Sequence, residues 1–206
     1  MAAMVSRNGT MKSAETLGTP DLLREGQCKP RRLPLSKERY AAGIDKEEAM
    51  VHFQETCLGR IGIAEEGGGI SHLFLGGDSV PREMEQGQTP LLREAFQQLE
   101  RYLAGELTDF SLALMPDGTP FMQRVWQELR RVPYGRTASY RDIATALGNP
   151  KAVRAVGMAN NRNPIPIFIP CHRIIGCSGK LVGYRGGLEM KRRLLELERG
   201  RACPQG

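Results

Sequence analysis

Asn-Pro-Ile-Pro-Ile-Phe-Ile-Pro-Cys-His-Arg, residues 163–173, is the stretch that most constrains the path and the chemistry of this chain. Its three prolines disfavour helix at and before each of their positions, so residues 165–169 are expected to run extended. Cys171 follows this apolar run, with His172 and Arg173 beside it. A free cysteine in an apolar stretch is usually a buried small hydrophobe. A reactive thiolate, however, needs a nearby base or positive charge, and both are adjacent here. The stretch therefore predicts an activated thiol, and by itself it names no substrate.

The geometry of an extended chain limits what His172 can do. Adjacent side chains of such a chain point to opposite sides, so His172 is not expected to contact the Cys171 sulfur directly without a turn. A bridging water is the more economical arrangement, and the imidazole then needs a further group to orient it. Glu198 in the last predicted helix is one candidate, and spacing alone does not select it over Glu196 or Glu189.

The residues on either side of this stretch predict a mainly helical second half. Two short helices joined by a Gly-Asn-Pro turn at 148–150 predict a helix-turn-helix, with a plain helical hairpin as the alternative. Trp126 and Phe121, on one face of the helix before them, are expected to be core residues. Start and stop signals place the helices from Thr119-Pro120 to just before Pro133, and over 140–147 (capped by Ser139), 151–160 and 188–199.

The first half predicts a small antiparallel sheet followed by a helix. Turn-prone glycines separate three short apolar or alternating runs, at 51–53, 61–63 and 70–75. Thr89-Pro90 begins a helix that Gly105 ends, and 110–114 is a candidate further strand. The predicted fold class is α/β (α+β). We expect a disordered leader over 1–48, an α/β domain over 49–116, a helical domain over 117–200 and a tail over 201–206.

Charge separates the two halves of the 206-residue chain. Residues 1–120 hold 13 Lys/Arg and 18 Asp/Glu, whereas residues 121–206 hold 16 Lys/Arg and 5 Asp/Glu. This distribution predicts a polyanionic partner for the second half, with a solvated basic face as the alternative. The five cysteines are irregularly spaced and predict neither a disulfide framework nor a zinc site. Without an apolar run of membrane-spanning length or a secretory signal, we expect a cytoplasmic protein and no membrane partner.

An ordered set of motifs resembles the O6-alkylguanine-DNA alkyltransferases. Pro170-Cys171-His172-Arg173, preceded by Asn163-Pro164, is similar to the active site of that family. The resemblance is dense over 119–199 and looser before it. It runs through Val-Pro-Tyr-Gly at 132–135, Ser-Tyr at 139–140, Leu-Gly-Asn-Pro-Lys-Ala-Val-Arg-Ala-Val-Gly at 147–157, Gly-Tyr-Arg-Gly-Gly-Leu at 183–188, Lys191 and Leu-Leu-Glu-Leu-Glu at 194–198. For the fold, it implies a ribonuclease H-like first domain.

The resemblance implies repair by direct reversal of damage. The alkyl group of O6-alkylguanine would be transferred irreversibly to Cys171, so each molecule would act once and no cofactor would be needed. His172 would act as the base through a water, Glu198 would orient the imidazole, and Asn163 would brace the turn that carries the cysteine. The range of alkyl groups, and activity on O4-alkylthymine, remain open.

The same resemblance implies a set of DNA-binding residues. Tyr140 would crowd the phosphate beside the target nucleotide, and Arg154 would fill the space of the flipped base. The small residues Ala155 and Gly157 would let their helix approach the minor groove. Arg185 stands where some members of the family have a small polar residue, which bears on pocket size and on phosphate contacts. The pocket for the extruded base would be lined by Tyr184, Ser178 and Pro166.

The implied partner is double-stranded alkylated DNA, bound without sequence specificity. We expect a monomer, with clustering on DNA left open, in a bacterial-type cytoplasm and at the nucleoid when bound. Some relatives carry a zinc ion in the first domain. The residues available here for such a site have no recognisable spacing, so no metal is expected: Cys28, Cys57, His52 and His72.

Three other functions compete with alkyl transfer. A sensor that only binds alkylated DNA would lack the acceptor cysteine, which is present at position 171. A helix-turn-helix regulator needs base-reading side chains, and Ala155 and Gly157 offer little readout. A cysteine hydrolase would turn over repeatedly and ignore DNA.

Overall fold

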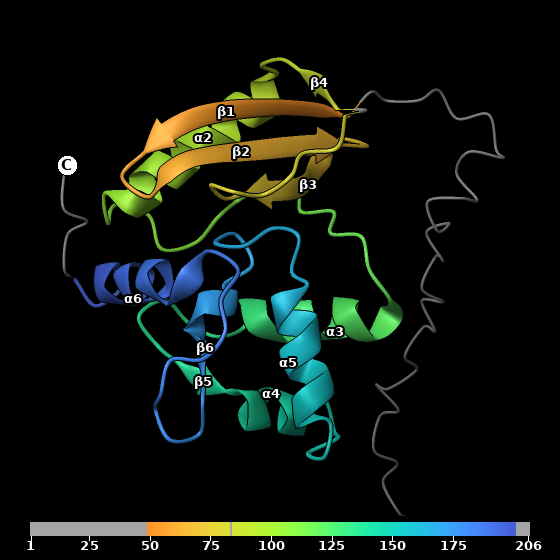
Figure 1. Ribbon diagram of the computed structural model, residues 1–206, viewed down its shortest axis with the longest axis vertical. Coiled ribbons are helices and arrows are strands. Elements are labelled where there is room, and N and C mark those ends of the chain that lie inside the picture. Colours follow the sequence, from red (N-terminus) through yellow and green to blue (C-terminus); the bar gives the residue numbers. More distant parts are fainter. Residues whose placement is uncertain (1–48, 83, 201–206) are drawn as a thin grey trace, which may run out of the picture. The chain divides into compact units, whose positions relative to one another are not determined.

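The computed structural model describes residues 49–82 and 84–200 (Figure 1), so the expected leader and tail lie outside the described residues. A small sheet holds β1 (Met50–Thr56), β2 (Gly59–Glu66), β3 (Gly69–Phe74) and β4 (Glu85–Gln86) in the order β3-β2-β1-β4. β1 pairs with β2, and β2 with β3, in the antiparallel sense that the sequence predicts. The two-residue β4 lies parallel to β1, so the sheet is mixed, not purely antiparallel.

Helix α2 (Pro90–Leu103) lies along one face of this sheet (Figure 1). Thr89 is its N-cap, and the threonine hydroxyl accepts a hydrogen bond from the Leu92 amide, as the Thr-Pro signal predicts. The alternating residues of β2 bury Ile61 and Ile63 towards this helix, which presents Leu92 and its helical neighbours to them. Burial of these two apolar faces holds sheet and helix together.

The predicted strand at 110–114 does not form. A single bridge joins Ile70 to Leu114, with Ile70 N–H donating to Ala113 O at 2.8 Å. The chain follows the β3 edge only briefly. The half-buried Phe110 packs against the core, with its ring centroid 4.7 Å from that of Phe168 and 5.1 Å from that of Tyr102.

The second half is mainly helical, as predicted. Its elements are α3 (Pro120–Arg130), β5 (Ala138–Ser139), α4 (Tyr140–Ala146), α5 (Val153–Asn161), the 3-10 turn η1 (Cys171–Arg173), β6 (Ile174–Ile175) and α6 (Gly187–Leu197). Ser139 and Asp142 form a reciprocal capping box that fixes the start of α4. α4 and α5 pack against each other and against α3, and their assignment as a helix-turn-helix stays a prediction. Within the described residues, no helix is both long enough and apolar enough to cross a membrane.

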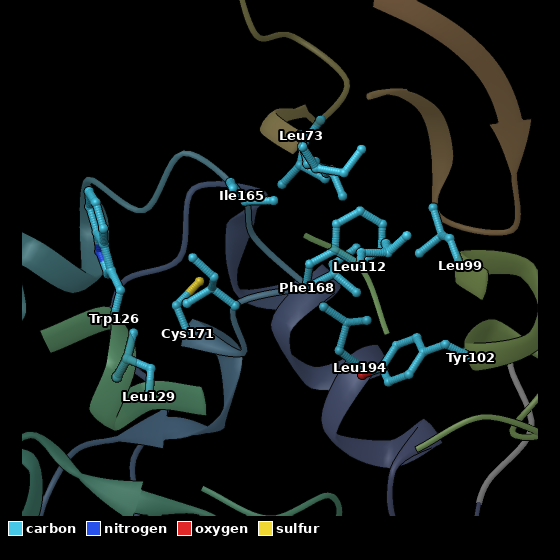
Figure 2. Packing of buried hydrophobic residues seen from close by; sticks show 14 of the residues in the cluster. Leu73, Leu99, Tyr102, Leu112, Trp126, Leu129, Ile165, Phe168, Cys171 and Leu194 are labelled. Atoms are coloured by element: carbon cyan, nitrogen blue, oxygen red, sulfur yellow. The ribbon is translucent and has the colours of Figure 1, made fainter. Parts of the chain in front are cut away.

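One cluster of buried side chains runs from the sheet and α2 into the helical half (Figure 2). Trp126 is a core residue as predicted: its side chain is buried and its indole N–H donates to Ala159 O at 2.9 Å, which joins α3 to α5. Phe121 is partly buried against the same cluster. The division of the chain at 116/117 into two domains stays a prediction.

The expectation that residues 165–169 run extended is wrong. Ile169 N–H donates to Ile165 O at 2.9 Å, Pro166 bridges to Ile169, and Ile167 has a φ of 74°, so the segment is a tight turn. Prolines exclude helix here, but they do not require extension. Burial of every residue of the turn, Pro166 included, favours the compact path.

Candidate active site

Asn163 ties together the turn that precedes the cysteine. Its side-chain amide donates to Ile169 O at 2.9 Å, and its carbonyl oxygen accepts from Ile165 N–H at 3.0 Å. The left-handed backbone of Ile167 is a strained conformation for a β-branched residue and persists only where its surroundings hold it. The geometry is the one expected of a residue that braces the turn.

Strand β3 also holds the start of this turn, through a backbone hydrogen bond. Leu73, on the edge strand of the sheet, donates its backbone N–H to Pro164 O at 2.8 Å. The path of the turn therefore depends on Asn163 and on the sheet. Cys171 follows the turn as the first residue of η1.

Cys171 is a buried thiol, 4% exposed, within the apolar cluster that also holds Trp126 and Phe168 (Figure 2). Burial raises the pKa of Cys171, and the Asn163 side chain together with the positive charge of Lys191 only partly opposes this. The resting group is therefore the protonated thiol, and the activation of this thiol that the sequence predicts stays a prediction. Attack on an electrophile needs a proton acceptor at the moment of reaction.

His172 is held in one tautomer by a buried carboxylate. Its Nε2 lies 2.8 Å from Glu198 Oε1, and because a carboxylate only accepts, Nε2 carries the proton and Nδ1 the lone pair. Nδ1 is buried and has no hydrogen-bond partner among the described residues. Burial lowers the pKa of His172, although Glu198 opposes this, so the imidazole is neutral with one acceptor nitrogen available.

Glu198, of the three glutamates that spacing left open, is the one within hydrogen-bond distance of His172. It caps the C-terminal end of α6, where the helix dipole disfavours a carboxylate. Its donors compensate: Tyr102 Oη at 2.7 Å, Arg173 Nε and Nη2 at 3.0 and 2.9 Å, and Gly135 N–H at 3.0 Å. Burial disfavours the charge, but the bonds from His172, Arg173 and Tyr102 bring the pKa of Glu198 to about 2.

The loop at 132–135 closes around this carboxylate. Val132 O accepts from Arg173 Nη1 at 2.6 Å, and Gly135 donates to Glu198 Oε2. Gly135 has a φ of 70°, and a Cβ there would lie 2.9 Å from the backbone oxygen of Glu198. A glycine is therefore required at this position for both conformation and space.

Sequence reasoning missed two residues of the site and misplaced a third. Tyr102 was given no role in the site, and its hydroxyl reaches Glu198; a buried tyrosine usually finds such a partner, which is the signal that was available. Lys191 is fully buried, with Nζ donating to the carbonyls of Ile174 at 2.6 Å and Val182 at 2.8 Å. Burial lowers the pKa of Lys191 to about 8. Arg173 points to Glu198, not to the thiol.

The predicted DNA-binding residues gather on α5 and beside it. Arg154 and Ala155 are exposed, and a Cβ at Gly157 would lie 3.9 Å from the Tyr140 ring. The Tyr140 hydroxyl donates to Val182 O at 3.4 Å, which joins the start of α4 to the loop before α6. Tyr140 and Gly157 therefore lie side by side, and the contacts of all four residues with DNA stay predictions.

The residues predicted to line a pocket are only partly brought together. The Tyr184 hydroxyl is buried without a hydrogen-bond partner among the described residues, and Pro166 is buried in the turn. Ser178 is exposed. Burial raises the pKa of Tyr184 well above its usual value, and the charge of a Cys171 thiolate would act in the same direction. The pocket role of Ser178 stays a prediction.

An open concavity of about 410 Å³ lies elsewhere, between the start of α4 and the loop after β6. Its lining includes Ser139, Arg141, Ile175, Cys177 and Gly179, and it does not include Cys171.

Arg185 is committed to partners within the chain. Its Nη2 lies 3.0 Å from Asp78 Oδ2 and 2.7 Å from Leu73 O, and its side chain is 33% exposed. The guanidinium therefore ties the loop before α6 to the β3 edge, and a phosphate contact by Arg185 would compete with this arrangement. Its assignment to DNA binding stays a prediction.

Comparison with known proteins places the chain among repair proteins of one kind. Residues 50–116 match the model of the 6-O-methylguanine DNA methyltransferase ribonuclease-like domain, and residues 120–200 match that of the DNA binding domain of the same protein. The constitutive methylated-DNA–protein-cysteine methyltransferase of Bacillus subtilis is 53% identical over 152 residues, which cover 70% of this chain and 92% of that protein. The methylated-DNA–protein-cysteine methyltransferase of Mycobacterium leprae is 59% identical over 106 residues, 52% of this chain and 64% of that protein. Among solved structures, Mycobacterium tuberculosis OGT in complex with DNA superposes with a TM-score of 0.70 at 44% identity, covering 74% of this chain and 94% of that one.

Proposed function

The chain belongs to the 6-O-methylguanine DNA methyltransferase family, and on that premise we propose that it moves the alkyl group of O6-alkylguanine irreversibly onto Cys171, one group per molecule. Its activity is that of a methylated-DNA–protein-cysteine methyltransferase, its partner is DNA, and it repairs DNA by alkyl transfer. The observation that carries the assignment to Cys171 is its place beside His172, a neutral, oriented base whose Nδ1 has no hydrogen-bond partner in the described part of the chain.

The proposed step balances with the groups of the site. The Cys171 thiol gives its proton to His172 through a water. Nδ1 of His172 is the nitrogen that accepts the proton, because Nε2 is hydrogen-bonded to Glu198. The sulfur then attacks the alkyl carbon in line, so that a C–S bond forms while the bond from carbon to O6 breaks. The leaving electron pair stays on the purine, and His172 gives the proton back, through solvent, to N1 of the purine anion, so that the product is guanine and the imidazole is neutral again. A dialkyl thioether is left at Cys171, and the neutral base offers no route to cleave it.

Burial of the thiol supports base flipping. An alkyl group on O6 lies inside the duplex, and a sulfur that is only 4% exposed meets it in line only if the nucleotide leaves the stack. We propose that Tyr140 crowds the neighbouring phosphate and that Arg154 occupies the vacated space, which offsets part of the unstacking free energy. Tyr140 is the first residue of α4, and Arg154 is exposed on α5, the helix whose Gly157 lies next to the Tyr140 ring.

The small residues of α5 support binding in the minor groove without sequence specificity. Ala155 and Gly157 allow close approach of α5 to the sugar edges, and they carry no donor or acceptor that reads a base. We propose a monomer as the active species. O4-alkylthymine is the second substrate to be tried, since it presents an alkyl–oxygen bond of the same kind.

Intact mass after mixing the protein with a duplex that holds one O6-methylguanine tests the proposal. One added methyl group, mapped to the Cys171 peptide and saturating at one per protein, is the expected result. Cys171→Ala should gain no mass, whereas Cys177→Ser, which removes an exposed thiol, should gain the methyl group as the wild type does. Repeated turnover, or methylation at another residue, would refute it.

A further inference from the structure

A side chain from α2 reaches the pair formed by His172 and Glu198. Tyr102 lies in the last turn of α2 and is fully buried, and its ring extends towards α6 at Leu194 (Figure 2). Its hydroxyl donates to Glu198 Oε1 at 2.7 Å and lies 3.3 Å from His172 Nε2. The Glu198 oxygen that orients the imidazole is therefore shared with a phenol that lies 70 residues before His172 in the chain.

We propose that Tyr102 is a positioning residue for alkyl transfer: by donating to the Glu198 oxygen that holds His172, it sets how strongly the imidazole accepts the Cys171 proton. The inference rests on the proposed function, in which His172 is the base. It gives the sheet-and-helix half of the chain a direct part in the reaction, beyond its support of the fold.

The Tyr102 hydroxyl and the His172 imidazole hydrogen-bond to the same negatively charged oxygen of Glu198. Glu198 Oε1 accepts from Tyr102, from His172 and from Arg173. A carboxylate favours the protonated imidazole beside it, and a donor on the same oxygen weakens that attraction. Removal of the Tyr102 hydroxyl therefore leaves more of the charge of Glu198 to favour protonated His172, which cannot accept the thiol proton.

Packing alone does not account for a tyrosine at this position. The ring is held by Phe110 at 5.1 Å and by an edge contact with Tyr134 at 6.0 Å, and a phenylalanine would make the same contacts. A buried hydroxyl destabilises the fold unless it is paired, so its presence is accounted for by the bond to Glu198. Burial and Glu198 hold the pKa of Tyr102 well above its usual value, so the phenol remains a donor at every pH of interest.

The charge around His172 comes from several elements. η1 and α6 both contribute groups that titrate or carry charge near it. They are Arg173, Lys191 and Glu198, in addition to Tyr102 from α2. Of these, only Tyr102 and Arg173 share the oxygen that His172 uses, and Arg173 keeps its charge throughout.

The test is the single-turnover rate of methyl transfer for Tyr102→Phe across pH 5–9, with saturating duplex. A hydrogen bond to a charged group is worth roughly the free energy of one pKa unit, so the acid limb of the profile should move up by about one unit. At pH values below the acid limb, the wild type should then react about tenfold faster than Tyr102→Phe, and at pH values above it the two rates should be about equal. The affinity for the duplex should be unchanged.

Tyr134→Phe is the matched control. It removes the hydroxyl of a neighbouring tyrosine whose ring packs against Tyr102 and which makes no hydrogen bond to His172 or Glu198 among the described residues. Its profile should overlay that of the wild type. A Tyr102→Phe profile that keeps its acid limb, or that falls by one factor at every pH, would mean that Tyr102 is structural only.

A second substitution guards against a variant that does not fold. Site-specific 3-fluorotyrosine at position 102 keeps the shape of the ring, and its more acidic phenol donates more strongly, so the acid limb should move down instead of up. A limb that does not move contradicts the inference. Wild-type protein in the same series distinguishes failure of the proposed function from failure of the positioning role of Tyr102. If the wild type does not become methylated at Cys171, the proposed function is wrong.

Discussion

Glu198→Gln is the substitution whose consequences the structure constrains best. It keeps the volume of the side chain and replaces one acceptor oxygen by an amide. In the wild type, the Arg173 side chain is 6% exposed and makes three hydrogen bonds of 3.0 Å or less to the Glu198 carboxylate. In the variant, no carboxylate neutralises the charge of Arg173. Loss of one partner of a buried pair leaves an uncompensated charge and destabilises by about 3–5 kcal/mol.

The pH dependence gives an independent magnitude for the same interactions. The pKa of Glu198 falls from 4.5 to about 2 on folding, and at 1.36 kcal/mol per unit this corresponds to about 3 kcal/mol. Because the folded pKa is depressed, this stability is fully present above the unfolded pKa near 4.5. It is lost as the pH falls through the folded value near 2. The two estimates describe one set of contacts and are not added.

Urea unfolding of wild type and variant at several pH values between 7 and 2.5 measures both magnitudes. At pH 7 the variant should be less stable by about 3–5 kcal/mol, a large share of an ordinary domain's 5–15 kcal/mol. The difference should shrink by most of that amount on acidification. Glu189→Gln in the same helix breaks an exposed pair with Arg192 and should lower the stability by less than about 0.5 kcal/mol at pH 7. A Glu198→Gln deficit that stays constant from pH 7 to pH 2.5 would refute the electrostatic argument.

Three further substitutions separate the turn, the DNA face and the loop before α6. Asn163→Ala removes two buried hydrogen bonds around the strained Ile167, so it should cost about 2–3 kcal/mol in urea unfolding and slow methyl transfer; an unchanged rate would contradict the bracing role. Arg154→Ala removes an exposed side chain, so stability should hold within about 0.5 kcal/mol while duplex affinity and its salt dependence fall; a loss of stability with normal affinity would count against its DNA role. Arg185→Ala breaks a partly exposed pair with Asp78 and should destabilise by at most about 1 kcal/mol at low salt, with the deficit reduced in 1 M salt; a salt-independent loss would indicate that the bond to Leu73 O dominates.

Local signals in the sequence predicted local structure well. Thr89, Thr119 and Ser139 were expected to begin helices, and each is an N-cap whose hydroxyl accepts a backbone N–H three residues on. Such caps depend on a few consecutive residues, so a single sequence contains all the information that they need. The same holds for the sheet turns, where Gly59 and Gly67 adopt left-handed conformations.

Features that depend on distant residues were not predictable in the same way. The prolines of residues 163–173 exclude helix, but the path that the chain takes is decided by Asn163 and by Leu73, a residue of the sheet. Spacing could not choose Glu198 among three glutamates, because the choice is made by the positions of His172 and Arg173 across a separate element. The two residues of β4 carry no periodic pattern at all.

A buried, protonated thiol suits the proposed reaction, in which each protein molecule would be consumed once. Cysteine reactivity follows thiolate content and exposure, so an exposed thiolate would also react with oxidants and small electrophiles. Burial holds Cys171 in the unreactive form, whereas Cys177, on the loop after β6, is exposed. The groups that release the Cys171 proton are themselves pre-arranged: Glu198 is saturated with donors, and His172 is neutral with Nδ1 unpaired. Reactivity therefore depends on an electrophile that fits beside Cys171, which favours an alkylated base delivered by DNA over reagents in solution.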